Sequence, residues 1–210
     1  TGVWRIHKYD ITSGALVTAF DGDGIATGTL AAAGDERPQA IAVDADYLYI
    51  AGYDNVPGNS EWRLEKRNKT TGALCAGGGE CASGAFDTDG VVQTNPSANT
   101  DRIYAIAIDP AYIYIAGYDS TVSATDGQWR TEKRDIATGA LDTAFDTDGI
   151  IQTNPFVTDI DSVTSLAVSS SSLYVGGYRD DDTGTWYLEK RDVTSGALDT
   201  AFSSIGIVLS

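Results

Sequence analysis

Short apolar runs recur along the chain and are separated by polar and turn-forming residues. Residues 105–108, Ala-Ile-Ala-Ile, alternate small and branched side chains, and residues 112–115, Tyr-Ile-Tyr-Ile, place tyrosines on one face and isoleucines on the other. Asp109 and Pro110 lie between these runs and are typical of a tight turn. A period of two predicts β-strands, and no long segment has the 3.6-residue period of an amphipathic helix. The pattern predicts an all-β protein.

A segment that begins at a tryptophan occurs four times, with a period of roughly 60 residues. Each copy continues through a strand-like run to a Gly-Ala-Leu turn and ends at a phenylalanine, and we name it the Trp half. The four tryptophans are Trp4, Trp62, Trp129 and Trp186. In the second copy, Trp62 and Leu64 are expected on one face of a strand, and Arg63 and Glu65 on the other.

A second segment, which we name the Ala/Tyr half, lies between successive Trp halves and occurs three times. Its first strand, which crowds near the axis, is expected at residues 40–43, 105–108 and 165–168, and a tyrosine-rich strand follows a short turn. An Ala/Tyr half followed by a Trp half gives four strands, so each repeat is predicted to be a four-stranded antiparallel meander. A β-helix has much shorter coils, and a two-sheet sandwich does not need such regular repetition.

The predicted fold is an all-β, β-propeller-type array of about three and a half blades, in a single repeat domain that spans residues 1–210. The domain divides into an orphan half-blade at residues 1–34 and blades at residues 35–98, 99–160 and 161–210. Both ends carry a Trp half, so ring closure within one chain is awkward. Three explanations are open: a fragment of a longer repeat protein, an open array whose ends neighbouring copies cover, or a small ring completed in trans.

Uncapped ends of a repeat array favour association with another chain. We therefore expect a homo-oligomer or a polymer that forms through the uncapped blade ends. A contact between the last blade of one molecule and the first half of the next would be heterologous, and such contacts propagate into rings or filaments.

Three sequence patterns together resemble the bacterial delta-60 repeat. They are the Trp-Arg-x-Glu-Lys-Arg strand, the Gly-Ala-Leu-Asp-Thr-Ala-Phe segment and the Tyr-Ile-Tyr-Ile-Ala-Gly-Tyr strand. Because the repeats follow one another along the chain, the resemblance covers essentially all of it. That family is β-propeller-like, has no assigned function and occurs in secreted and surface proteins. The resemblance implies a propeller-type fold and an extracellular or cell-surface location, and it offers no catalytic residues. The last copy departs from the pattern, because residues 203–206 read Ser-Ser-Ile-Gly instead of Asp-Thr-Asp-Gly.

The formal net charge of −16 narrows the choice of partners. An acidic surface repels phosphate backbones and anionic membranes, so we expect neither nucleic acid binding nor membrane insertion. No run approaches the ~18 consecutive apolar residues of a membrane span. The chain opens at Thr1 instead of a methionine, which suggests a removed leader or a cut from a longer chain.

Two cysteines, Cys75 and Cys81, flank a glycine-rich segment. Because the segment is short and flexible, the two sulfur atoms can approach bonding distance. A disulfide would indicate an oxidising compartment, and two free thiols are the less favoured alternative.

The Asp-x-Asp-Gly motif occurs three times and is the candidate metal site. Two carboxylates at this spacing before a glycine open many calcium loops, but no glutamate stands where an EF-hand requires it. The alternative is a hairpin turn in which aspartate accepts backbone hydrogen bonds. Calcium is therefore a candidate ligand, and no cofactor is expected to be required. The candidate ligands are Asp21, Asp23, Asp87, Asp89, Asp146 and Asp148.

Two other patterns have structural and functional interpretations. Arg63, Glu65 and Arg67 share one strand face and recur in part in the next copy, so we expect an ion-pair network between blades, with carboxylate binding as the alternative. The tyrosine stripes are expected in the core, with sugar stacking or an interface as the alternative.

Catalysis finds no support in the sequence. His7 is the only histidine and stands where the other copies have glutamate, and a Ser-His-Asp arrangement cannot be assembled around it. We expect a non-enzymatic extracellular scaffold, as a self-assembling surface or filament subunit or as a fragment of a longer protein. The alternative is a propeller module that binds carbohydrate, peptide or calcium through variable loops at residues 55–61, 120–128 and 180–185.

Overall fold

The computed structural model describes residues 3–28, 36–55, 58–77, 79–82, 84–156, 160–178 and 184–209. These residues contain 14 β-strands and no helix, so they also contain no helix that is long and apolar enough to cross a membrane. The strands form one two-stranded sheet and three four-stranded sheets, all antiparallel. The prediction of an all-β protein is confirmed. Residues 180–183 of the third variable loop lie outside the described residues, as do residues 56 and 57 of the first.

The strands of each sheet follow one another along the chain, so each sheet is a simple meander. Sheet I contains β1 (Arg5–His7) and β2 (Ile25–Thr27). Sheet II contains β3 (Arg37–Val43), β4 (Tyr47–Asp54), β5 (Glu61–Asn68) and β6 (Val91–Thr94). Sheet III contains β7 (Arg102–Ile108), β8 (Tyr112–Ser123), β9 (Asp126–Asp135) and β10 (Ile150–Thr153). Sheet IV contains β11 (Ser162–Val168), β12 (Ser172–Tyr178), β13 (Trp186–Asp192) and β14 (Ile207–Leu209).

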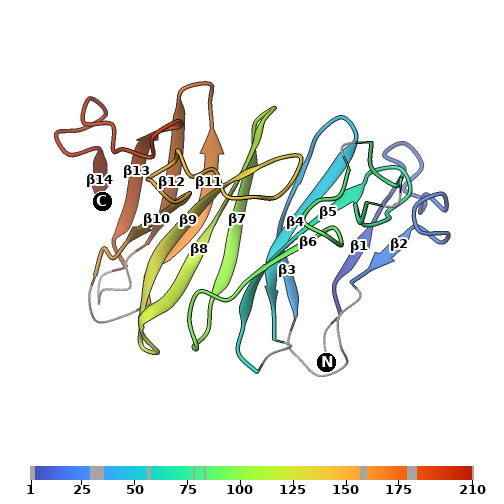
Figure 1. Ribbon diagram of the computed structural model, residues 1–210, viewed down its shortest axis with the longest axis horizontal. Coiled ribbons are helices and arrows are strands. Elements are labelled where there is room, and N and C mark those ends of the chain that lie inside the picture. Colours follow the sequence, from blue (N-terminus) through green and yellow to red (C-terminus); the bar gives the residue numbers. More distant parts are fainter. Residues whose placement is uncertain are drawn as a thin grey trace.

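The four sheets follow one another in chain order across Figure 1, with sheet I at one end and sheet IV at the other. β3, β7 and β11 are the first strands of the three four-stranded sheets. β7 contacts both β3 and β11, so these strands connect neighbouring sheets. The described residues form an open row of sheets, and the two ends of the chain lie far apart in the view.

The first strand of each four-stranded sheet is three residues longer than the sequence pattern predicts. Its added segment contains an irregularity in register, which in sheet III lies between Ile103 and Ala105. Gly117 of β8 pairs with Ile103 here, and a Cβ atom at this glycine would collide with the backbone carbonyl of Arg102. The glycine of the Ala-Gly-Tyr sequence is therefore required because two backbones approach each other at the bulge.

The predicted variable loop at residues 120–128 is largely strand. β8 continues to Ser123 and β9 begins at Asp126, and these two residues pair at the tip of a long hairpin. The expectation of a loop was wrong, because the variable sequence at these residues belongs to an extended hairpin. The backbone N–H groups of Ser120 and Thr121 donate to the carboxylates of Asp101 and Asp119, which satisfies them where the strand register is irregular.

The hydrophobic core is divided among the junctions between neighbouring sheets. We name the side of each sheet that carries Trp62 and its equivalents the forward face, and the side that carries Arg63 and its equivalents the rear face. Forward-face residues of sheet II pack against rear-face isoleucines of sheet III, and the junctions I–II and III–IV repeat this arrangement. Tyr49, Tyr53, Tyr114 and Tyr118 are buried, which confirms the core interpretation for these four tyrosines.

Candidate interaction surface

The first three tryptophans of the Trp halves are buried in junctions between sheets. Each side chain is at most 2 % exposed. In each junction the indole Nε1 donates a hydrogen bond to the carbonyl oxygen of a tyrosine in the second strand of the next sheet. The pairs are Trp4 with Tyr53 (3.3 Å), Trp62 with Tyr118 (3.1 Å) and Trp129 with Tyr178 (3.3 Å). Each tryptophan thus binds the sheet that follows it in the chain.

The rear face of the next sheet supplies a side chain that covers each indole ring. The guanidinium of Arg63 lies 5.6 Å from the ring centre of Trp4, and a second arginine covers Trp62 at 5.6 Å. In sheet IV, Tyr187 takes the place of this arginine and contacts the ring of Trp129 edge-on, with centroids 5.1 Å apart. Cation–π and edge-on aromatic contacts are both favourable over a tryptophan ring.

The Asp-x-Asp-Gly motifs also take part in the junctions. The backbone N–H of the first aspartate donates to the carbonyl oxygen of the residue that precedes the turn glycine in the next sheet. The pairs are Asp21 with Thr71 (2.8 Å), Asp87 with Thr138 (2.8 Å) and Asp146 with Ser195 (3.0 Å). These aspartates have φ between 48° and 53°, a left-handed conformation that aspartate adopts more readily than most residues. The motif therefore connects neighbouring sheets.

The second aspartate of each motif shapes its own turn. Its Oδ1 accepts the backbone N–H two residues later, at 2.8 Å for Asp23, 3.0 Å for Asp89 and 2.9 Å for Asp148. This geometry corresponds to the hairpin-turn alternative. Across the residues whose positions are described, no three His, Cys, Asp or Glu side chains gather in a way that could hold a metal ion. A calcium site at these motifs stays a prediction.

The Arg-x-Glu-x-Arg motif forms buried ion pairs. Glu65 binds Arg63 through Oε1 and Arg67 through Oε2, both at 2.7 Å. Sheet III repeats this arrangement around Glu132. Arg63 also pairs with Asp54 of the neighbouring strand β4 at 3.4 Å. These ion pairs lie within one sheet, whereas the sequence predicted ion pairs between neighbouring blades. Besides the contact of Arg63 with Trp4, a hydrogen bond from Arg67 Nη2 to the carbonyl oxygen of Thr27, 3.2 Å long, connects the network to the preceding sheet.

Glu61 belongs to a second buried polar cluster, which the sequence analysis did not identify. The side-chain amide of Gln93 donates to Asp54 at 2.8 Å and to Glu61 at 3.1 Å. Burial, together with the negative charge of Asp54, raises the pKa of Glu61 to about 7. In sheet III, Gln128 stands at the position of Glu61 and donates to Asp119 at 3.0 Å. The exchange of Gln128 for glutamate at the equivalent position 61 is the sequence signal from which the cluster could have been predicted.

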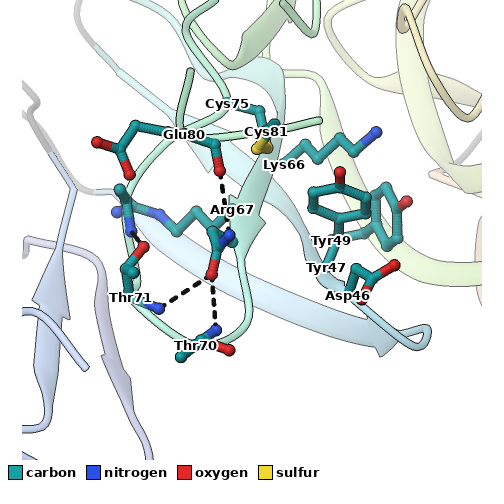
Figure 2. Close-up of a disulfide and its surroundings, with 12 residues drawn as sticks. Asp46, Tyr47, Tyr49, Lys66, Arg67, Thr70, Thr71, Cys75, Glu80 and Cys81 are labelled. Atoms are coloured by element: carbon teal, nitrogen blue, oxygen red, sulfur yellow. Dashed lines mark hydrogen bonds between the residues drawn. A yellow bond between two sulfur atoms is a disulfide. The ribbon is translucent and has the colours of Figure 1, made fainter. Parts of the chain in front are cut away.

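The predicted disulfide between Cys75 and Cys81 is present, with the two Cα atoms 5.2 Å apart. Figure 2 shows it close to Lys66 of β5, beyond which lie Tyr47 and Tyr49. Both sulfur-bearing residues are buried in the junction between sheets II and III. Both cysteines belong to the segment that connects β5 with β6, and the disulfide closes a short loop within this segment over the forward face of sheet II.

Within the described part of the chain, no further sheet lies against the forward face of sheet IV. Trp186, the fourth tryptophan, is 74 % exposed, in contrast to its three buried equivalents. Tyr178, Phe202 and Val208 also expose more than a third of their surface here. A cavity of about 370 Å³ lies on this face and is lined by Tyr178, Trp186 and Leu188, among others. This open face is the candidate interaction surface.

The opposite end of the row exposes the rear face of sheet I. Arg5, His7 and Tyr9 occupy the positions of Arg63, Glu65 and Arg67, and all three are exposed. Nδ1 of His7 lies 3.0 Å from the hydroxyl of Tyr9, in a solvent-facing position. The only histidine of the chain is therefore a surface residue at one end of the row.

No protein-family model matches this chain, and no curated protein matches it either.

Proposed function

We propose that the chain is a non-enzymatic extracellular scaffold whose sheets act as blades of an open β-propeller-type array. Its copies associate end to end. One observation carries the proposal: Trp186 is 74 % exposed although its three equivalents are at most 2 % exposed. A patch of large apolar side chains in water favours association, because burial removes apolar surface from water. The repeated junctions within the chain indicate the kind of surface that would cover it.

The rear face of sheet I in a second copy carries some of the groups that cover a tryptophan in the internal junctions. Arg5 holds the position from which Arg63 covers Trp4, so it is placed to cover Trp186 of a neighbouring molecule. Ser13 precedes the turn glycine Gly14, so its carbonyl corresponds to the acceptors in the three internal junctions. These groups support a heterologous contact between opposite ends, which propagates into rings or filaments.

His7 supports the same contact, because it replaces a glutamate that is buried in sheets II, III and IV. Glu65 pairs with two arginines, whereas sheet I keeps only Arg5 at these positions, so a carboxylate buried there would be less well compensated. The three equivalent positions on the rear face of sheet I carry no carboxylate. A molecule with a net charge of −16 repels its copies, and an end face without acidic side chains at these positions reduces that repulsion locally.

The extracellular assignment rests on the disulfide between Cys75 and Cys81, because such bonds persist in oxidising compartments. The resemblance to the delta-60 repeat supports the same location. The non-enzymatic assignment rests on the surface position of His7 and on the engagement of the repeated acidic motifs in turns and junctions.

The test compares the native chain with Trp186→Lys at rising concentration, by sedimentation velocity and negative-stain electron microscopy. We expect the native chain to form larger species, seen as rings or filaments, and the variant to stay monomeric. Val122→Lys is the matched control, because Val122 is also exposed but lies at the tip of the β8–β9 hairpin. A native chain that stays monomeric at all concentrations, or equal association of native chain and Trp186→Lys, would refute the proposal.

A further inference from the structure

We propose that the open side of β1 is a docking site for a two-stranded β-hairpin of the Ala/Tyr type. The hairpin would add to sheet I and complete a four-stranded sheet. This site lies at the opposite end of the row from Trp186. Binding of a hairpin at β1 does not require association of the chain through Trp186.

The strand pairing supplies the first observation. β5, β9 and β13 carry the Trp motif, and each has a paired strand on both sides. β1 carries the same motif and, within the described part of the chain, pairs with β2 alone. A strand edge with open N–H and C=O groups is a template for a further strand. Sheet I therefore has the outer half of the four-stranded arrangement and offers an edge for the inner half.

The second observation is the exposure of the rear face of β3. Ile41 and Val43 are 57 % and 56 % exposed. Their equivalents in sheet III, Ile106 and Ile108, pack in the junction core with Ala42 and Tyr47 from the inner strands of sheet II. The corresponding residues of sheet IV pack in the same way with inner-strand residues of sheet III. Ile41 and Val43 therefore occupy positions that, in the other junctions, pack against the first two strands of the preceding sheet.

The third observation is a cavity of about 280 Å³ between these two features. One wall is formed by Arg5, Ile6 and His7 of β1, and the opposite wall by residues of sheet II that include Ile41 and Ile50. The cavity thus lies where the open edge of β1 meets the exposed rear face of β3. An added hairpin would fill it with side chains while its backbone pairs with β1.

The internal junctions define the chemistry of the hairpin. Small residues such as Ala42 are needed in the strand nearest the axis, and tyrosines such as Tyr49 on the face that meets the next sheet. A tight turn of the kind at Asp44, whose Oδ1 accepts the backbone N–H groups of Asp46 and Tyr47, joins the two strands. Residues 102–119 of the chain contain this pattern in full, so a hairpin of this sequence is the probe of choice.

The experiment titrates a cyclic peptide with the sequence of residues 102–119 into the Trp186→Lys variant, so that association at the other end does not contribute. Cyclisation holds the hairpin and reduces its ordering cost. We expect saturable binding by calorimetry and slower hydrogen exchange of the β1 amides. Lysine at Ile41 or Val43 is expected to weaken binding at least about tenfold. Both residues are exposed, so the fold should tolerate these changes, which circular dichroism can verify.

Val122→Lys and a peptide of scrambled sequence are the controls, and neither should reproduce these effects. The inference fails if the peptide does not bind saturably, or if Ile41→Lys and Val43→Lys bind it as well as their parent does. It also fails if the protected amides lie in β2, β10 or β14 instead of β1. Self-association through Trp186 can hold or fail independently, because it is measured without the peptide.

Discussion

Replacing Glu61 with glutamine is expected to raise the stability of the fold above pH 7 and to change it little below pH 4.5. The pKa of Glu61 is raised from 4.5 to about 7 by burial and by the charge of Asp54. In the unfolded chain it returns to its ordinary value. Between these two pH values the folded state holds a proton that the unfolded state has lost. The free energy of unfolding therefore falls as the pH rises from 4.5 to 7.

The size of the effect follows from the pKa shift. One pKa unit corresponds to about 1.4 kcal/mol, so the shift of Glu61 sets an upper limit of about 3 kcal/mol. Because the effective dielectric constant at protein sites is well above that of a dry interior, we expect a gain of about 1 to 2 kcal/mol for Glu61→Gln at pH 8. Glutamine fits the site, since Gln128 already occupies the equivalent position beside Asp119.

Urea denaturation followed by tryptophan fluorescence at pH 5 and pH 8 measures this difference. Glu80→Gln is the matched control, because Glu80 is an exposed glutamate and undergoes the same chemical change. Burial also raises the pKa of Glu36, so the native chain and the variant both keep some pH dependence. The difference between the two proteins is the informative quantity. An unchanged pH profile, or a loss of stability at pH 8, would refute the electrostatic explanation.

Three further perturbations test the packing. Phe86→Ala should lower the free energy of unfolding by about 3 to 5 kcal/mol, because this side chain is fully buried, and Phe202→Ala, whose side chain is 37 % exposed, should cost clearly less in the same urea titration. Replacing Cys75 and Cys81 together with serine should cost about 2 kcal/mol, since the closed loop is short, and a midpoint unchanged from that of the disulfide-bonded chain would contradict this. Gly117→Ala should markedly reduce the melting temperature measured by circular dichroism, because the Cβ of the alanine would collide with the neighbouring strand. A melting temperature equal to that of the native chain would show that the two backbones do not need to approach closely here.

The sequence predicted the strands because alternation reports directly on which side chains share a face. Trp62 and Leu64 are in one junction, and Arg63 and Glu65 are on the other side of the same strand, as their spacing indicated. The bulge beside Gly117 was missed because a glycine in a strand can mark several structures. Its role depends on how closely the partner strand approaches.

The candidate surfaces were less accessible to sequence reasoning. Trp186 begins a copy of the same motif as its three equivalents, apart from Tyr187 in place of an arginine. The motif alone therefore does not indicate that Trp186 is exposed, because its exposure depends on what lies against sheet IV. The shifted pKa of Glu61 depends on its burial and on the charge of Asp54, its partner across the pair of strands β4 and β5. Both features arise from tertiary packing, which periodicity does not encode.

The junctions give the row of sheets a polarity. In each one the indole N–H of a tryptophan points along the chain towards a carbonyl of the next sheet, and the covering arginine or tyrosine comes from that next sheet. Two forward faces placed against each other would leave both indole donors without this acceptor. A symmetric pair of molecules cannot reproduce the internal junction. Any assembly that extends it must have two chemically different ends, and addition at one end would be blocked by changes that leave the other intact.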